Sequence, residues 1–365
     1  MNFELSDEQR LLRESMNAWL KRASAAQGLP EALSLWSGLN AEVGVLGIGT
    51  CQTMGGTGGG AVEIMLIMEE LGAALAVEPF VETVVIATSL LQKAGALAWV
   101  AAIGRGELIA TLAWLEPSSR PDPLHISTRA VRTAGGWRID GNKSVVAWAQ
   151  DAHLLLVTAC TGDFKAPSLF LIPRKEKGVA LAPYSTIDGR PVADVTLSGV
   201  SVPNDALLGT EGDALSYLEC TLDEARAALC AEAVGVLRVL FDTTVAYSKD
   251  RRQFGHSIAS FQAVQHRLAD MFLQVELASA ASLLATLSLS KSRPQRIQAV
   301  SAAKATIASA CRFVGQNAIQ LHGGMGMSAE TAITRYFKRA TALEFELGSR
   351  DYHVARHRAA SADEL

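Results

Sequence analysis

Several residue types are scarce in this chain, and each scarcity argues against a class of protein. The sequence has five cysteines in 365 residues, and no two of them form a C-x-x-C pair. Because the number is odd and the spacing is wide, we expect no disulfide framework and no metal site, and a reducing, cytoplasmic setting. The formal net charge of −4 gives no reason to expect nucleic acid or an anionic membrane surface as a partner.

Long apolar runs are missing as well. The first ten residues, MNFELSDEQR, are polar, and no apolar stretch of membrane-spanning length follows them. We therefore expect neither a signal peptide nor membrane insertion. Apolar residues nevertheless make up 49% of the chain and charged residues only 19%, which is enough to bury a sizeable core in two or three domains.

The residue composition and pattern change at two points along the sequence. Residues 1–107 are rich in helix formers. Their first helix is expected to begin at Ser6-Asp7-Glu8-Gln9, which has the pattern of a capping box. Residues 108–212 contain short β-branched stretches separated by Gly, Pro, Asp or Asn, which predict antiparallel strands and tight turns. Residues 213–365 are again helical, with apolar stripes that need partners and predict an antiparallel bundle of four-helix type. The predicted fold class is α+β, mostly helical.

Glycine marks three local features. The stretch GTCQTMGGTGGGA (49–61) predicts a loop that needs positive φ or a close backbone approach, and no Gly-Lys-Ser/Thr follows that would make it a P-loop. Within the β-rich part, AGGW (134–137) and IDGN (139–142) have the composition of hairpin or turn positions.

Two stretches of the C-terminal third carry longer motifs. The first, YSKDRRQFGHSIASFQAVQHRLADM (247–271), contains Y-x3-R-x-Q-F-G, then F-Q-x3-Q and L-A-D-M. The second is QLHGGMGMSAETAITRYFKRA (320–340). With FELSDEQ and MEELGAALA nearer the N-terminus, they resemble the acyl-CoA dehydrogenase family over essentially the whole chain. The segments LAVEPFVETVV and AALCAEAVG are similar to the small subunits of pimeloyl-CoA and steroid side-chain dehydrogenases.

The resemblance implies FAD-dependent α,β-dehydrogenation of an acyl-CoA thioester, in lipid or steroid degradation, with a flavoprotein or another molecule accepting the electrons. In the family the two motifs contact the adenine and pyrophosphate end of FAD, which is bound mainly by the neighbouring subunit. An arginine can contact a pyrophosphate with two hydrogen bonds, and glycines let backbone N–H groups approach a ligand. The residues that the resemblance assigns to FAD are Arg251, Gln253, Phe254, Phe261, Gln320, Gly323 and Gly324.

The β-rich part departs from the family pattern where side chains contact the flavin ring. The family has T-E-P followed by G-S-D; here the stretch is WLEPSSRPD, with Leu115 in place of Thr and Pro121 in place of Ser, while Glu116, Pro117 and Asp122 remain. The family then has W-I-T-N; here Val145 replaces the Trp and Ala147 the Thr. The resemblance therefore implies a flavin pocket without its usual hydroxyl donors and aromatic wall.

The catalytic base is also displaced. The family has two locations for this glutamate, and they fall here on Leu347 and on Ala225, which precedes Arg226. A glutamate stands one residue earlier in each case, at Glu346 and Glu224. One residue of a helix is a rotation of about 100°, so Glu224 is expected to face elsewhere. Glu346 belongs to a carboxylate cluster, ATALEFELGSRD (340–351), and a backbone shift could direct it toward the site.

These observations favour one hypothesis and leave others open. The first is a subunit of a heteromeric dehydrogenase whose second, acyl-CoA dehydrogenase-like subunit supplies the base. The alternatives are a self-sufficient homotetramer that uses Glu346, a flavoprotein of the same fold with a different reaction, and a non-catalytic structural subunit.

Overall fold

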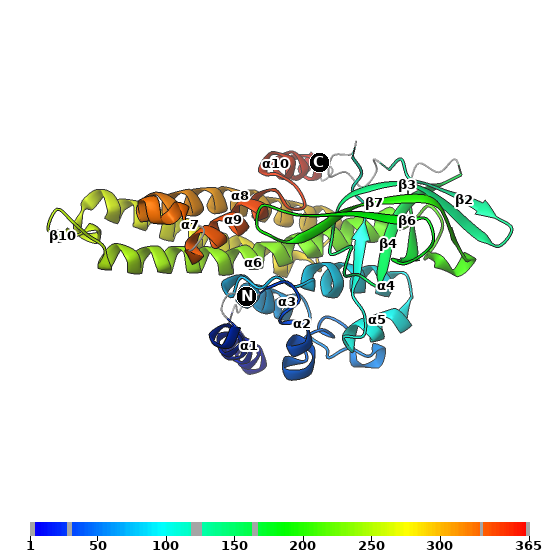
Figure 1. The fold of residues 1–365 in the computed structure, drawn as a ribbon, viewed down its shortest axis with the longest axis horizontal. Coiled ribbons are helices and arrows are strands. Elements are labelled where there is room, and N and C mark those ends of the chain that lie inside the picture. Colours follow the sequence, from blue (N-terminus) through cyan, green and yellow to red (C-terminus); the bar gives the residue numbers. More distant parts are fainter. Residues whose placement is uncertain (1–3, 28–30, 118–125, 163–166, 329–330, 363–365) are drawn as a thin grey trace. The chain divides into compact units, whose positions relative to one another are not determined.

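The computed structural model describes residues 4–27, 31–117, 126–162, 167–328 and 331–362 (Figure 1). The chain forms two compact units. One unit comprises Met1–Glu31, Ala61–Ala76 and Arg226–Leu365, and the other comprises Ala32–Gly60 and Val77–Ala225.

The first unit begins with a capped helix, α1 (Asp7–Gln27). The N–H of Gln9 donates to Ser6 Oγ at 3.2 Å, and the N–H of Ser6 donates to Gln9 Oε1 at 3.0 Å, which confirms the predicted capping box. Helix α3 (Ala61–Ala73) packs on α1. A Cβ atom on Gly72 of α3 would lie 2.2 Å from the carbonyl oxygen of Glu232, so only glycine allows α3 and α6 to approach this closely.

The helical bundle makes up the rest of the first unit. The long helices α6 (Ala214–Asp250), α7 (Gln262–Ser288) and α8 (Arg293–His322) run alongside one another, and α9 (Ala332–Phe345) and α10 (Arg350–Ala362) pack on α8 (Figure 1). The shorter elements are the strands β9 (Arg252–Gln253) and β10 (His256–Ser257) and the 3-10 turns η5 (Ile258–Ser260) and η6 (Gly323–Met327). The predicted bundle is confirmed.

The second unit combines short helices with a sheet. Its helical elements are α2 (Trp36–Gly38), η1 (Leu39–Val43), η2 (Gln52–Met54), the π-helical η3 (Phe80–Ala87), α4 (Thr88–Lys93), α5 (Leu97–Gly104) and η4 (Asn204–Ala206). The predicted glycine loop (49–61) contains η2 and reaches the first residue of α3. Gly55 and Gly58 have φ of +83° and +84°, and a Cβ atom on Gly56 would lie 2.1 Å from the carbonyl oxygen of Thr50. Positive φ and a close backbone approach both occur there.

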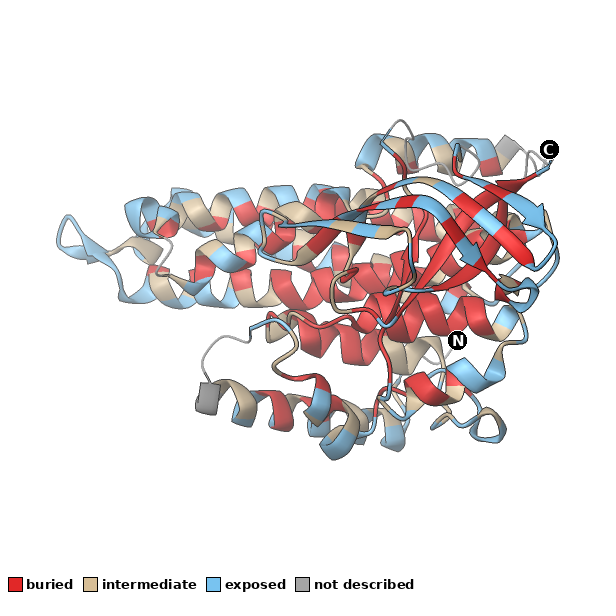
Figure 2. Ribbon diagram, turned by 45° about the vertical axis from the view of Figure 1, so that its right-hand side comes forward, coloured by how far each residue is buried: buried red, intermediate tan, exposed pale blue. Residues whose placement is uncertain are grey.

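Among the described residues the sheet has eight strands, and burial alternates along several of them (Figure 2). The order is β6-β7-β3-β2-β4-β5-β8, with β1 paired to β4. The strands are β1 (Ala110–Ala113), β2 (Arg129–Thr133), β3 (Gly136–Ala147), β4 (Leu154–Thr161), β5 (Pro167–Pro173), β6 (Val179–Ser185), β7 (Pro191–Val202) and β8 (Leu207–Leu208).

Two details of the predicted sheet are wrong. Strands β1 and β2 each pair with β4 in parallel, whereas the other pairs of the sheet are antiparallel. The AGGW turn is confirmed as the β2–β3 hairpin, but IDGN lies inside β3. The register shifts between Ile139 and Gly141, so this glycine, with φ of +158°, serves a β-bulge rather than a turn.

The fold class is confirmed as mostly helical α+β, with N-terminal helices, a middle sheet and C-terminal helices. The domain boundaries at 107/108 and 212/213 stay a prediction. Among the described helices, α7 has the length and composition to cross a membrane, but it is one of the helices of the bundle and packs on α8.

Candidate active site

The two long sequence motifs meet at one end of the bundle. The ring of Tyr247, on the last turns of α6, stacks on the ring of His322 at the end of α8, with 4.3 Å between centroids and 22° between planes. The Tyr247 hydroxyl also donates to the carbonyl oxygen of His322 at 3.4 Å. Residues 251–261 and 320–327 are therefore neighbours in space, although some 60 residues of chain separate them.

The Q-F-G part of the first motif is a tight hairpin between β9 and β10. Phe254 and Gly255 are its two central residues, with φ of +53° and +79°, as a type I′ turn requires. The turn lifts the Phe254 side chain into solvent, where it is 89% exposed, and its ring lies 6.3 Å from that of Phe261. This geometry explains why glycine follows the phenylalanine.

The donors predicted for a pyrophosphate are exposed at this end of the bundle. Arg251, Gln253 and Gln320 all have exposed side chains. Gly323 ends α8 with φ of +59°, and a Cβ atom on Gly323 or Gly324 would meet nothing within 4 Å. A guanidinium, amide groups and open backbone suit the donor set that a diphosphate needs. The residues present fit the pyrophosphate end of FAD, and the assignment of each residue stays a prediction.

The three departures from the flavin-facing pattern lie close together in the sheet unit. The N–H of Ser144, next to Val145, donates to the carbonyl oxygen of Leu115 at 2.9 Å. The Thr111 hydroxyl donates to the carbonyl oxygen of Ala147 at 2.8 Å. Adjacent backbone segments thus hold Leu115, Val145 and Ala147. None of these aliphatic side chains can donate a hydrogen bond. Pro121 and Asp122, the other two positions of the pattern, lie outside the described residues.

Glu116, the retained acid of the T-E-P position, is buried in the sheet unit. It accepts hydrogen bonds from Lys143 Nζ at 2.8 Å and from the hydroxyls of Ser127 and Thr128. Burial alone would raise the pKa of Glu116, but these hydrogen bonds and the Lys143 charge outweigh it and lower the pKa to about 2. Burial lowers the pKa of Lys143 to about 8 against the opposing effect of Glu116. The carboxylate stabilises the fold between strands β3 and β4 and is not free to move protons.

Leu347, one expected base position, lies in a tightly held turn between α9 and α10. Its φ is +55°, an uncommon conformation for a residue other than glycine. Its carbonyl oxygen accepts from Arg226 Nε at 3.2 Å and lies 3.2 Å from His353 Nε2. Burial, followed by the charges of Arg226, Lys304 and Arg356, lowers the pKa of His353 to about 2. The imidazole is therefore neutral, and it holds its proton on Nε2 to donate to Leu347.

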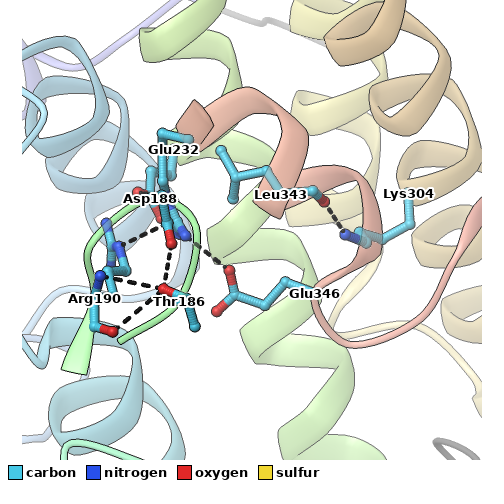
Figure 3. A network of polar contacts seen from close by, with 8 residues as sticks. Thr186, Asp188, Arg190, Glu232, Lys304, Leu343 and Glu346 are labelled. Carbon is cyan, nitrogen blue, oxygen red and sulfur yellow. Dashed lines mark hydrogen bonds and ion pairs between the residues drawn. The ribbon is translucent and has the colours of Figure 1, made fainter. Parts of the chain in front are cut away.

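The carboxylates of residues 344–351 have other partners. Glu346 lies 3.0 Å from Arg339 Nη1, and Arg339 is held by Glu232 through two contacts of 2.7 Å (Figure 3 shows Glu232 and Glu346). Glu344 is buried and pairs with Arg312. The Asp351 side chain is 94% exposed. None of the three stands at position 347, and Glu346 as base stays a hypothesis.

Glu224, the second displaced glutamate, is tied to helix α4. Lys93 Nζ lies 3.0 Å from its Oε1 atom, and the Ser89 hydroxyl donates to its Oε2 atom. The Glu224 side chain is 29% exposed, whereas Ala225 is fully buried. The rotation expected between adjacent helical positions is present, and Glu224 as base also stays a hypothesis.

The cations around the Leu347 turn were not predicted from the sequence. Lys304 is 1% exposed, and its Nζ atom donates to the carbonyl oxygen of Leu343 at 2.9 Å (Figure 3). Burial lowers the pKa of this lysine. The signal was a lone charge within the apolar stretch AVSAAKATIASAC. His353 gave no comparable signal, because polar and apolar residues are mixed around it in α10. No cluster of His, Cys, Asp and Glu suited to a metal ion occurs among the described residues.

Comparison with known proteins agrees with this architecture. The acyl-CoA dehydrogenase N-terminal, middle and C-terminal domain families match residues 6–98, 111–200 and 215–360. A probable acyl-CoA dehydrogenase of Bacillus subtilis, YngJ, is 30% identical over 96% of each chain. The chain belongs to the acyl-CoA dehydrogenase family, whose members are oxidoreductases acting on CH–CH bonds.

Two solved structures are similar over nearly the whole chain. A chain of the ChsE4–ChsE5 complex from Mycobacterium tuberculosis is 26% identical, with a TM-score of 0.88 over 100% of this chain and 99% of that one. The Tcur3481–Tcur3483 steroid ACAD is 27% identical, with a TM-score of 0.87 over 98% of both chains.

Proposed function

We propose that this chain is one subunit of a heteromeric acyl-CoA dehydrogenase and that its partner subunit supplies the catalytic base. The observation that carries the proposal is the pair of aliphatic residues, Leu347 and Ala225, at the two expected base positions. A base must come within roughly 3 Å of the proton that it removes. Glu346 is held by Arg339 and Glu224 by Lys93, so neither neighbouring glutamate stands free beside these positions.

The intact motif at the end of the bundle is this chain's proposed contribution to the partner's site. Arg251 and Gln253 would bind the pyrophosphate, while Gln320, Gly323 and Gly324 would bind the adenosine end of the cofactor. When bound, FAD supplies the acceptor for the hydride that leaves the β carbon of the acyl group. In the family these residues act across a subunit boundary, which suits a chain with an altered flavin-ring face and an intact pyrophosphate motif.

The exposed face of α7 supports a partner subunit. Phe272, Leu273, Leu277, Leu284 and Leu287 are 37–55% exposed along this helix, while Met271 and Val275 face its buried side. A helix that is apolar on two sides suits the interior of a larger assembly. Helix α7 begins at Gln262, directly after the loop that holds Arg251, so a partner that covers the whole of α7 would meet that loop as well.

The similar proteins support the heteromer without establishing it for this chain. ChsE4–ChsE5 is a complex by its name, and the steroid ACAD pairs Tcur3481 with Tcur3483. By this analogy the substrate is an acyl-CoA of lipid or steroid degradation, oxidised in the cytoplasm, and a flavoprotein or another acceptor takes the electrons.

The main alternative is a self-sufficient homotetramer in which Glu346 is the base. One observation favours it: the Glu346 side chain is 30% exposed and ends α9, where a change of backbone angles could redirect it. A flavoprotein of the same fold with another reaction and a non-catalytic structural subunit remain further alternatives.

Co-expression tests the proposal directly. The chain is purified alone and together with a dehydrogenase-like partner that has an intact T-E-P, W-I-T and base glutamate. Flavin per chain and oxidation of acyl-CoA thioesters with an artificial acceptor are then measured. We expect activity and stoichiometric FAD only in the co-expressed sample, and robust turnover by the isolated chain would contradict the heteromer.

A further inference from the structure

Val145, at the position of the missing aromatic wall, occupies a strained bulge of β3. The register between β3 and β7 shifts between Lys143 and Val146, and Val145 takes a φ of +53°. Positive φ is an outlier for a β-branched residue, and bulges of this kind redirect side chains at functional sites. The Val145 side chain is 49% exposed. The bulge therefore sets the direction of the Val145 side chain, which is accessible to solvent.

One carboxylate oxygen links this bulge to an aromatic residue on another strand. Asp194 Oδ1, on β7, accepts from the N–H of Val145 at 3.0 Å and from the hydroxyl of Tyr184, on β6, also at 3.0 Å. Both donors lie on the same acceptor atom, so the Tyr184 hydroxyl is at most about twice a hydrogen-bond length from the Val145 nitrogen. The Tyr184 side chain is 42% exposed.

The strand register places Tyr184 on the same face as Ala147. Tyr184 pairs with Val192 across β6 and β7, and Ala147 pairs with the same Val192 across β3 and β7. Residues directly opposite each other on neighbouring strands point to the same face of a sheet. Asp194 lies two residues beyond Val192 and so shares that face. Tyr184 thus stands about two strand spacings, roughly 10 Å, from Ala147, and the buried Val192 lies between them.

We propose that Tyr184 supplies, from β6, the aromatic face that Val145 lacks, and that it stacks on the planar ring of a flavin. The Asp194 carboxylate fixes both the ring and the bulge, so the two elements form one surface. Burial, followed by the hydrogen bond to Asp194, raises the pKa of Tyr184, and the hydroxyl stays protonated at neutral pH. The inference rests on the proposed function only in taking a flavin as the planar ligand.

Riboflavin is the probe, because it has the flavin ring without the pyrophosphate and so does not need the Arg251 motif of a second subunit. The full chain is titrated with riboflavin, and quenching of flavin fluorescence gives a Kd. We expect Tyr184→Ala to raise this Kd roughly tenfold and to reduce the quenching at saturation, since stacking of a base on an aromatic side chain has an effect of this order. Tyr184→Phe should keep the stacking and the quenching.

Two further variants make the test specific. Asp194→Ala removes the shared acceptor and should raise the Kd by a smaller factor, roughly threefold, because the ring loses its anchor but not its area. Val131→Ala removes an exposed side chain, 52% accessible, from strand β2 of the same sheet and should leave the Kd unchanged. Circular dichroism checks that all variants are folded.

Equal riboflavin affinity in wild type and Tyr184→Ala would overturn the proposal, and so would the absence of any binding to the folded wild-type chain. Either result would leave the heteromer untouched. Conversely, turnover by the isolated chain together with a Tyr184-dependent riboflavin affinity would overturn the heteromer and keep the assignment of Tyr184.

Discussion

Arg226 Nε donates to the carbonyl oxygen of Leu347 at 3.2 Å, and this one hydrogen bond connects the two places where a base was expected. Leu347 is one of them, and Ala225, the residue before Arg226, is the other. His353, on α10, also holds the turn, because its Nε2 atom lies 3.2 Å from the same oxygen. The turn is held in a defined conformation although its position 347 carries no carboxylate. An organised turn with an aliphatic side chain fits a chain that kept its architecture and lost the base.

We expect Glu346→Gln to have little effect on the co-expressed enzyme, less than a threefold change in kcat. The carboxylate is held by Arg339, and position 347 itself is leucine. Loss of a true general base costs roughly 10²–10⁴-fold, which separates the two outcomes clearly. Steady-state kinetics with an artificial electron acceptor provides the measurement. A hundredfold fall in kcat with unchanged flavin content would instead identify Glu346 as the base.

The Arg339 network should matter for stability. Arg339→Met removes two contacts of 2.7 Å from the buried Glu232, and removing one partner of a buried ion pair typically costs about 3–5 kcal/mol. Chemical denaturation at pH 7 measures the change in the free energy of unfolding. Arg105→Met is the matched control, since Arg105 also pairs with a glutamate, Glu107, but the two side chains are 57% and 54% exposed. The control should be much milder, and equal losses would argue against burial as the cause.

The sequence predicted the periodic parts of this structure well. The capping box at Ser6, the AGGW hairpin and the long helices all depend on local patterns, and local patterns decide such elements. The IDGN stretch was misread as a turn. Whether an Asp-Gly sequence closes a hairpin or forms a bulge depends on the register of its strand with β7. Parallel pairing of β1 and β2 with β4 depends on the path of the whole chain in the same way.

The residues of the candidate site also fall into those that local motifs predict and those that depend on the path of the whole chain. Motif residues such as Arg251 and Gly323 could be named from the sequence, and the stacking of Tyr247 on His322 explains why their two segments meet. The partners of Glu346 and Glu224 could not be named, since Arg339 and Lys93 have no fixed spacing from them. Tyr184 was not predicted for a related reason. Its aromatic ring lies on another strand, β6, so a comparison of the sequence with the family pattern, position by position, does not find it.

Arg251→Ala should weaken the retention of FAD by the assembled protein. A charge-assisted contact of arginine with phosphate contributes on the order of 1.5–3 kcal/mol, which corresponds to roughly ten- to a hundredfold in affinity. Flavin absorbance after extensive dialysis, and titration of the apoprotein with FAD, measure the loss. Arg252→Ala is the control, because this neighbouring arginine is equally exposed but lies outside the Y-x3-R-x-Q-F-G pattern. Full flavin content in Arg251→Ala would contradict the assignment.

The buried pair of Glu116 and Lys143 should make stability depend on pH in the acid range. The pKa of Glu116 is lowered to about 2 in the folded chain, below the ordinary value of 4.5. A depressed carboxyl pKa contributes stability that is fully present above about pH 4.5 and is lost as the pH falls toward 2. A shift of this size corresponds to about 3 kcal/mol. Glu116→Gln should therefore lower the free energy of unfolding at pH 7 and flatten its fall between pH 5 and pH 3.

The control for this prediction is Glu107→Gln. The pKa of Glu107 is also lowered, by its hydrogen bond from Arg105, but its side chain is 54% exposed, so solvent screens the pair. Urea unfolding at a series of pH values, with each variant beside the wild type, gives both slopes. The buried pair is the cause only if Glu116→Gln removes part of the wild-type slope and Glu107→Gln keeps it. An unchanged slope in Glu116→Gln would mean that other carboxylates govern acid unfolding and that Lys143 does not hold Glu116 ionised below its ordinary pKa.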